Sequence, residues 1–146
     1  MEDEDSLENV DIDEYIGATI SLERDLEEYL MRDFNQIEIG LRLYSKEGVT
    51  GRQFNTEVGR IDMLAVDKNG DFVVIELKAG TASNSVIGQI LGYISWVRQN
   101  IAHGRNVRGM IIADDFDKRV KYASSEMPNI SLKKYAVTFM LKDVQA

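Results

Sequence analysis

The hydrophobic pattern of residues 59–78, GRIDMLAVDKNGDFVVIELK, predicts two apolar strands joined by a tight turn. The turn sequence DKNGD is typical of a three-residue hairpin loop, in which Gly70 takes the position that needs a positive φ. Three charged residues are set into the apolar runs, namely Asp62, Glu76 and Lys78. These positions are the first candidates for chemistry.

Pairing Asp67 with Asp71 across the turn would fix the register of the hairpin and place Asp62 opposite Glu76. On the same face this register pairs Leu64 with Val74 and Val66 with Phe72. The other face is predicted to carry Ile61, Met63, Ala65, Val73, Ile75 and Leu77. Both faces are apolar, which is typical of strands that are covered on both sides.

The facing carboxylates of Asp62 and Glu76 predict a cation site. Like charges directly opposed across a hairpin destabilise a sheet, and a divalent cation bound to both carboxylates removes their repulsion. Glu76 and Lys78 are two residues apart, so Lys78 adds an ammonium on the same side of the strand. The alternative interpretation is a solvated strand end with an incidental Glu–Lys pair, which leaves the mutual register of the charges unexplained.

The rest of the pattern predicts helices around a mixed sheet. A helix is expected from an N-cap at Ser21 to about Phe34, with an apolar stripe made of Leu22, Leu26, Tyr29 and Leu30. Further elements are expected as a strand at 37–43, a short strand or loop at 52–58, a helix at 85–101 capped by Ser85 or Ser83, a strand at 107–113, a helix at 115–127 and a strand at 130–141. The order αβββαβαβ indicates an α/β fold in which a mixed central sheet has helices on both faces.

Composition indicates one compact domain at residues 15–146. The chain has 146 residues, 44% of them hydrophobic, with one proline and no apolar run of membrane-spanning length. The absence of cysteine excludes disulfides, zinc–thiolate sites and thiol nucleophiles, and it fits a cytoplasmic location. His103 is the single histidine, so histidine-based catalytic triads are not expected.

The net charge of −8 comes entirely from residues 1–14, which contain eight Asp or Glu and no Lys or Arg. Residues 15–146 are therefore neutral overall, since −8 minus −8 is zero. We expect residues 1–14 to be a disordered acidic leader. A sharper hypothesis is that the leader lies over residues 98–134 and competes there with nucleic acid. This segment contains eight Lys/Arg and four Asp/Glu.

An Asp followed by a strand that ends in Glu-x-Lys resembles the PD-(D/E)XK nuclease superfamily. Residues 59–80 together with GQILGYISWV are similar to the RecB-like nuclease domain of NucS-type (EndoMS) DNA endonucleases, a resemblance that runs from about residue 22 to about residue 135. Gln89-x-x-x-Tyr93 matches the Q-x-x-x-Y motif of the RecB-like branch. The resemblance implies a restriction-endonuclease-like core and metal-dependent hydrolysis of DNA phosphodiester bonds.

The matching residues then have expected roles. Asp62, Glu76 and the backbone carbonyl of Leu77 would bind Mg²⁺, or Mn²⁺, because oxygen ligands without thiols favour these ions. Lys78 would orient the attacking water. A further carboxylate of the superfamily, on the first helix, corresponds to Glu23, with Glu27 as the rival position.

The surroundings of this site have expected roles as well. Gln89 would hydrogen-bond a catalytic water or a phosphate, and Tyr93 would pack on the nucleic-acid backbone. Arg52 and Arg60 flank the site, where they would act either as phosphate contacts or as structural counter-charges. For Trp96, which lies one turn beyond Tyr93, ordinary packing is favoured.

Substrate and partners stay open at this point. The separate N-terminal DNA-binding domain of NucS-type enzymes has no counterpart in this sequence. A junction resolvase, a flap-cutting or restriction-type enzyme, or a nuclease that takes its specificity from a partner protein all fit, and so does a homodimer or an RNA substrate. The alternative from another class is a non-catalytic nucleic-acid-binding or assembly module that retains the fold.

Overall fold

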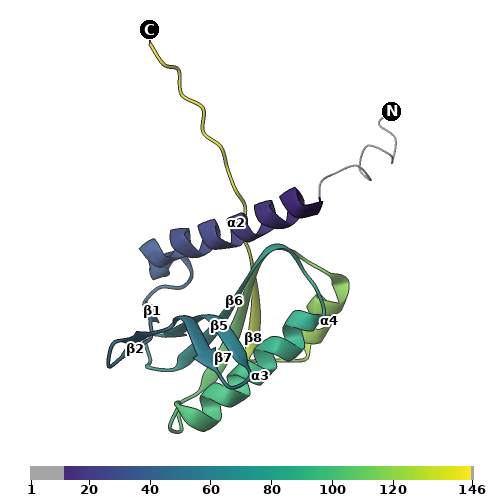
Figure 1. Ribbon diagram of the computed structural model, residues 1–146. Helices are drawn as coiled ribbons and strands as arrows, with labels where there is room; N and C mark the ends of the chain where they lie inside the picture. Colours follow the sequence, from purple (N-terminus) through teal and green to yellow (C-terminus); the bar gives the residue numbers. More distant parts are fainter. Residues whose placement is uncertain (1–11, 146) are drawn as a thin grey trace.

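The computed structural model of the protein describes residues 12–145, and a mixed β-sheet forms its centre (Figure 1). Helix α2 (Ile12–Arg32) covers one face of the sheet, while α3 (Ser85–Asn100) and α4 (Lys118–Ser125) cover the other. A short 3₁₀ helix, η1 (Phe34–Gln36), follows α2. The expected α/β architecture of a mixed sheet flanked by helices is confirmed.

The strands of the described residues are β1 (Arg42–Leu43), β2 (Ser45–Lys46), β3 (Val49–Thr50), β4 (Arg52–Thr56), β5 (Gly59–Val66), β6 (Phe72–Ala82), β7 (Val107–Phe116) and β8 (Ile130–Lys134). In the central sheet their order is β1-β5-β6-β7-β8, and β4 also pairs with β5. β5 and β6 are antiparallel, whereas β6, β7 and β8 run parallel. The connection through α3 therefore joins an antiparallel half of the sheet to a parallel half.

The β5–β6 hairpin has the predicted register. The Asp67 N–H donates to the Asp71 carbonyl over 2.9 Å, and Gly70 has a φ of +85°. The Cα partners are Met63 with Ile75, Leu64 with Val74, Ala65 with Val73 and Val66 with Phe72. The loop chemistry of the sequence thus sets the pairing of the whole hairpin.

Both faces of this hairpin are buried, as its pattern predicts, because each face packs against a helix. Leu64, Val66, Phe72 and Val74 belong to the core on the α3 side, and Met63, Ala65, Val73, Ile75 and Leu77 to the core on the α2 side. The prediction for Ile61 is wrong, since this side chain packs in the α3-side core. The side chains of β5 stop alternating strictly between the two faces at Ile61, because the pairing of β5 with β6 stops at Met63 and Ile75.

Helix α2 differs from its prediction in both length and orientation. It begins at Ile12, so Ser21 lies inside the helix and is not its N-cap. Of the predicted leader, residues 12–14 are helical, and residues 1–11 lie outside the described part of the chain. Leu22 and Tyr29 are exposed at 51% and 56%. The face toward the sheet carries Leu26 and Leu30, as predicted, together with the partly or fully buried side chains of Glu23 and Glu27.

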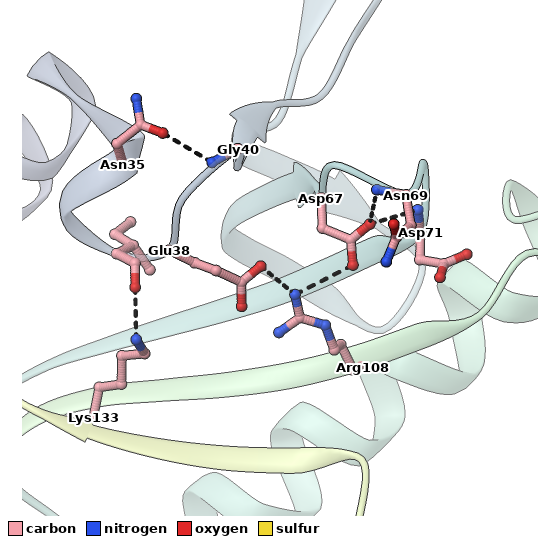
Figure 2. A network of polar contacts seen from close by, with 9 residues as sticks. Asn35, Glu38, Gly40, Asp67, Asn69, Asp71, Arg108 and Lys133 are labelled. Carbon is pink, nitrogen blue, oxygen red and sulfur yellow. Dashed lines mark hydrogen bonds and ion pairs between the residues drawn. The ribbon is translucent and has the colours of Figure 1, made fainter.

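A polar network holds the turn of the hairpin against the segment that follows α2 (Figure 2). Asp67 Oδ1 accepts the N–H groups of Asn69 and Asp71 at 2.9 and 3.0 Å, and its Oδ2 lies 3.2 Å from Arg108 Nη2. Arg108 also forms an ion pair with Glu38. Burial by itself raises the pKa of Asp67, but these N–H groups and the guanidinium together bring the pKa below its ordinary value.

The predicted strand at 37–43 shrinks to Arg42 and Leu43 because local contacts hold the preceding residues in turns. Asp33 caps η1 through the Asn35 N–H at 2.9 Å, and the Asn35 side chain accepts the Gly40 N–H at 2.9 Å (Figure 2). Such side-chain to backbone bonds compete with strand pairing. Gly40 has a φ of +84°, which ends any extended run.

The ends of the later elements also move. The N-cap of α3 is Asn84 and not Ser83 or Ser85, while α4 is shorter than expected and is capped by the Asp117 side chain through the Arg119 N–H at 2.7 Å. β7 continues to Phe116, and β8 ends at Lys134. Beyond Tyr135 the chain carries exposed apolar side chains, which are Val137, Phe139, Met140, Leu141 and Val144. Across residues 12–145, no helix has both the length and the hydrophobicity needed to cross a membrane.

Candidate active site

Asp62 and Glu76 lie where the backbone pairing of β5 with β6 ends. Beyond this point, their carboxylates accept backbone N–H groups of the facing strand. The Asp62 N–H donates to Glu76 Oε1 over 3.2 Å, and the Leu77 N–H donates to Asp62 Oδ2 over 2.8 Å. Each carboxylate is therefore anchored by the backbone of the opposite strand. The structure brings the two acids together as the register predicts.

Glu76 is the more buried partner, with 1% of its surface exposed. Burial, and then the charge of Asp62, raise the pKa of Glu76 to about 9 despite the N–H bond from Asp62 and the positive charge of Lys78. With a pKa of about 9, the carboxyl group of Glu76 is protonated at neutral pH when no cation is bound. A bound cation would displace that proton, since metal ligands act in their deprotonated form.

Helix α2 adds two carboxylates to the same place, because its inward face carries acids at one-turn spacing. Glu23 Oε1 accepts the Ala79 N–H over 3.2 Å, just beyond Lys78 on β6. Glu27 is 8% exposed and lies 3.4 Å from Arg52 Nε. Both rival positions therefore face the site, and the ion pair gives Arg52 the contact of a structural counter-charge.

Gln53 is a functional candidate that the sequence did not reveal. Its Nε2 donates to Glu27 Oε1 over 3.0 Å and lies 3.5 Å from Asp62 Oδ1, so one amide joins α2 to β5. Its backbone has a φ of +48° inside strand β4, a conformation that is costly for a residue with a side chain. The backbone conformation of Gln53 indicates a functional role, whereas no pattern in the sequence does so.

Four of these side chains, those of Glu23, Glu27, Gln53 and Asp62, line a cavity of about 400 Å³. It is lined by Glu23, Arg24, Glu27, Gln53, Arg60, Asp62 and Leu77. Arg60 is exposed at the rim, and Arg24, which the sequence analysis did not single out, joins it there. The lining combines three carboxylates with two arginines. This arrangement suits a cation together with a phosphate group.

The donor set of the site fits a hard divalent cation. Asp62 and Glu76 offer carboxylate oxygens and Leu77 offers a carbonyl oxygen, which are ligands that Mg²⁺ and Mn²⁺ accept together with water. Within residues 12–145, no three acidic or histidine side chains gather closely enough to form a complete ligand cage by themselves. Glu23 and Glu27 would therefore act through water or through their hydrogen-bond partners.

The Q-x-x-x-Y motif divides into an exposed and a buried half. Gln89 is exposed on α3, and its Nε2 donates to the Tyr93 hydroxyl over 3.2 Å. Tyr93 is only 4% exposed and belongs to the α3-side core, so the expected packing of its ring on nucleic acid does not fit this structure. Its hydroxyl instead approaches Gly59, where an added Cβ would lie 2.7 Å away. The expected packing role of Trp96 is confirmed by its edge-on contact with Phe54.

Comparison with known proteins identifies the family. A family model described as the endonuclease NucS C-terminal domain matches residues 22–136. The chain belongs to this family.

Curated relatives carry the same name. The chain is 27% identical over 118 residues to "Endonuclease NucS" of Sulfolobus acidocaldarius, covering 78% of this chain and 44% of that protein. It is 32% identical over 110 residues to "Endonuclease NucS 2" of Halobacterium salinarum, covering 73% and 40%. The chain therefore spans less than half the length of these NucS relatives.

Solved structures support the same fold. A repair endonuclease from Pyrococcus abyssi superposes with a TM-score of 0.66 at 24% identity, covering 77% of this chain and 46% of that one. A structure described as an EndoMS–dsDNA complex gives a TM-score of 0.66 at 23% identity, with 77% and 44% covered. The expected NucS-type restriction-endonuclease-like fold is thereby confirmed.

Proposed function

We propose that this chain is a metal-dependent DNA endonuclease module that hydrolyses phosphodiester bonds. The observation that carries the proposal is the pair of half-buried Asp62 and buried Glu76, which lies at the end of a ladder, is anchored by opposite strands and is followed by Lys78. Placing a buried acid beside a second acid costs desolvation and, when both are ionised, repulsion, and a bound cation would offset both costs. The pair fits a site that is completed by a cation.

The residues at the end of the hairpin would hold the cation and position the attacking water. Asp62, Glu76 and the Leu77 carbonyl would hold Mg²⁺ or Mn²⁺, which supplies a Lewis acid and lowers the pKa of a bound water. Lys78 orients the attacking water and offsets charge on the phosphoryl oxygens. Gln53 and Glu27 keep Asp62 in place from the side of α2.

Other side chains around the cavity would contact the substrate. Arg60 and Arg24 at the cavity are suited to a phosphate oxygen, since guanidinium groups bind phosphate in a bidentate manner. Gln89 is exposed and available for a water or phosphate oxygen. Glu23 would reach the ion through a water.

DNA is the proposed substrate because the matched relatives are named endonucleases and one matched structure is described as a complex with double-stranded DNA. The chain corresponds to less than half of these proteins. We propose that a partner protein or a second copy of the chain contributes to substrate selection. A second copy would also place one site on each strand of a duplex.

Cleavage of a labelled panel tests the proposal. The panel holds single-stranded, duplex, flap, mismatch and four-way-junction DNA, together with a duplex RNA, in Mg²⁺, Mn²⁺ or EDTA. We expect metal-dependent cutting by wild type and by Asp25→Ala, a control on the exposed side of α2, and a loss of at least about 100-fold in Asp62→Ala and Lys78→Ala. Equal cutting by all four proteins would refute the site. Binding of the panel without cutting in any metal would favour the non-catalytic module.

A further inference from the structure

A second cavity, of about 490 Å³, lies at the opposite end of the sheet and is lined by basic side chains. Its lining, here called the arginine cavity, consists of Arg98, Gly104, Arg105, Asn106, Val107, Arg108 and Asn129. The arginines come from three segments, namely helix α3, the loop after it and strand β7. No acidic residue is part of the lining.

Two of the three arginines have no counter-charge within residues 12–145. Arg108 is neutralised by Glu38 and Asp67, which approach it from outside the lining (Figure 2). Arg98 and Arg105 form no ion pair with any described residue, and both are exposed. Two unpaired guanidinium groups in one cavity repel each other unless an anion lies between them.

Arg105 is held in place before any ligand arrives. Its Nη1 donates to the Asn69 carbonyl over 3.2 Å. The guanidinium also lies against Gly70, where an added Cβ would come within 3.1 Å of Nη1. One donated hydrogen bond leaves most of the five N–H donors of this side chain free. The hairpin turn therefore presents a positioned, unsaturated guanidinium to the cavity.

Neutral donors add to this set. The side-chain amides of Asn106 and Asn129 have no hydrogen-bond partner within the described part of the chain, whereas their backbone carbonyls accept the N–H groups of Phe72 and Gly109 at 3.0 and 2.8 Å. The backbone is thus fixed by the sheet, and the amide groups stay available. A cavity with many N–H donors and no negative charge in its lining suits a phosphate, which presents only acceptors.

We propose that the arginine cavity binds a phosphate of the DNA backbone, away from the bond that is cut. The inference rests on the proposed function for the identity of the nucleic acid. Val107 pairs with Phe72 and Ile111 pairs with Glu76, so four residues, or roughly 13 Å of strand, separate the two sites along β6. A duplex covers that distance within about four base pairs. Because phosphate contacts carry no base information, this site fixes the position of the duplex and not its sequence.

The salt dependence of DNA binding tests the inference without any cleavage. The full chain and its Arg98→Gln/Arg105→Gln variant would be titrated onto a labelled 30-base-pair duplex in EDTA at several salt concentrations. The slope of log K against log salt is expected to fall in magnitude by about one for each arginine removed. Arg32→Gln/Lys46→Gln, which removes the same charge elsewhere on the surface, is the matched control and should keep the wild-type slope. Thermal melting checks that every variant is folded.

A titration with inorganic phosphate locates the contact directly. The NMR signals of Arg98, Arg105, Asn106 and Asn129 are expected to shift in wild type, and those of Asn106 and Asn129 are expected to stay in place in the double variant. Unchanged signals, or a slope that falls equally in the control, would overturn the proposal. Phosphate binding with an unchanged DNA slope would overturn it too, since the cavity would then take only small anions. If wild type cuts no DNA but the double variant still has a smaller salt slope than wild type, the proposed catalysis is refuted and this inference stands.

Discussion

At the scale of single residues, the most costly feature of the site is the carboxyl group of Glu76. It lies in the core beside a second carboxyl group, and burial followed by the charge of Asp62 raises its pKa to about 9. Since the folded state holds this proton more tightly than the unfolded chain, the protonated carboxyl favours folding at low pH. That contribution is complete below the ordinary pKa of about 4.5 and is lost as the pH rises toward 9.

The variant Glu76→Gln is expected to remove this pH dependence. In EDTA the free energy of unfolding of wild type should fall between pH 5 and pH 9, by roughly 1.4 kcal/mol for each unit of difference between folded and unfolded pKa. The amide has the same shape and no charge, so the difference between variant and wild type should widen with pH. Urea unfolding at a series of pH values measures it. Parallel curves for the two proteins would show that Glu76 is not the buried titrating group.

Gln53 is the second residue whose local cost indicates a role in the site. Its positive φ is retained although glycine or asparagine would adopt this conformation more easily. We expect Gln53→Ala to weaken Mn²⁺ binding by about 10-fold or more, because partners that hold a metal ligand in place commonly contribute this much. Calorimetric titration with Mn²⁺ measures the affinity, and Gln99→Ala, an exposed glutamine of α3, is the control. Unchanged affinity would mean that the contacts of Gln53 serve folding alone.

At the scale of elements, the register of the hairpin was predictable from its sequence, whereas the start of the helix that packs on it and part of its inward face were not. The loop from Asp67 to Asp71 encodes its own turn, so the register followed from local chemistry. Hydrophobic periodicity placed Leu22 and Tyr29 toward the sheet beside Leu26 and Leu30, yet Glu23 and Glu27 are the side chains that join the two leucines there. Local patterns fail where a site needs polar groups inside, which is where departures from the simplest sequence rules are expected.

The same limit applies to the other site residues. Gln53 reaches Glu27 across 26 positions of the chain, and no periodicity within one element records such a contact. Gln89 and Tyr93 lie one turn apart on α3 and contact each other, as the spacing of the motif implies, but Tyr93 is buried, and Gly59 leaves room for its hydroxyl. Tertiary packing, absent from any window of sequence, decides which half of that motif meets solvent.

The hairpin turn makes its own prediction. Burial opposes the charge of Asp67, whereas two N–H groups and Arg108 favour it and bring its pKa below the ordinary value (Figure 2). A lowered pKa gives stability that is present above pH 4 and is lost as the pH falls through the folded value. Asp67→Asn should therefore cost about 1–3 kcal/mol at pH 7 and much less at pH 2–3. Urea unfolding at both pH values measures this, and the variant Asp25→Asn at an exposed position is run in parallel as the control. A cost that is independent of pH would assign the effect to hydrogen-bond geometry and not to charge.

At the scale of the whole molecule, charge is divided between two ends of one sheet. The acidic cavity beside α2 and the arginine cavity at the start of β7 lie on a body whose formal charge at residues 15–146 is zero. A neutral total therefore conceals a local separation of charge, and such separation, more than net charge, governs how a polyanion approaches. The cation at the acidic end would complete the arrangement, because without it that end repels the phosphate backbone.

Metal binding should then stabilise the entire chain, since an ion that binds only the folded state shifts the unfolding equilibrium by mass action. At a Mg²⁺ or Mn²⁺ concentration 100 times the dissociation constant, the gain is about 2.7 kcal/mol. The gain at fixed metal concentration should be larger at pH 8.5 than at pH 6, because the ion must displace the proton of Glu76 and competes with it less at high pH. Thermal melting of wild type, Asp62→Ala and Asp25→Ala with and without metal measures both effects. If Asp62→Ala gained as much as the other two proteins, the ion would be binding elsewhere, and the cation site at the end of the hairpin would have to be abandoned.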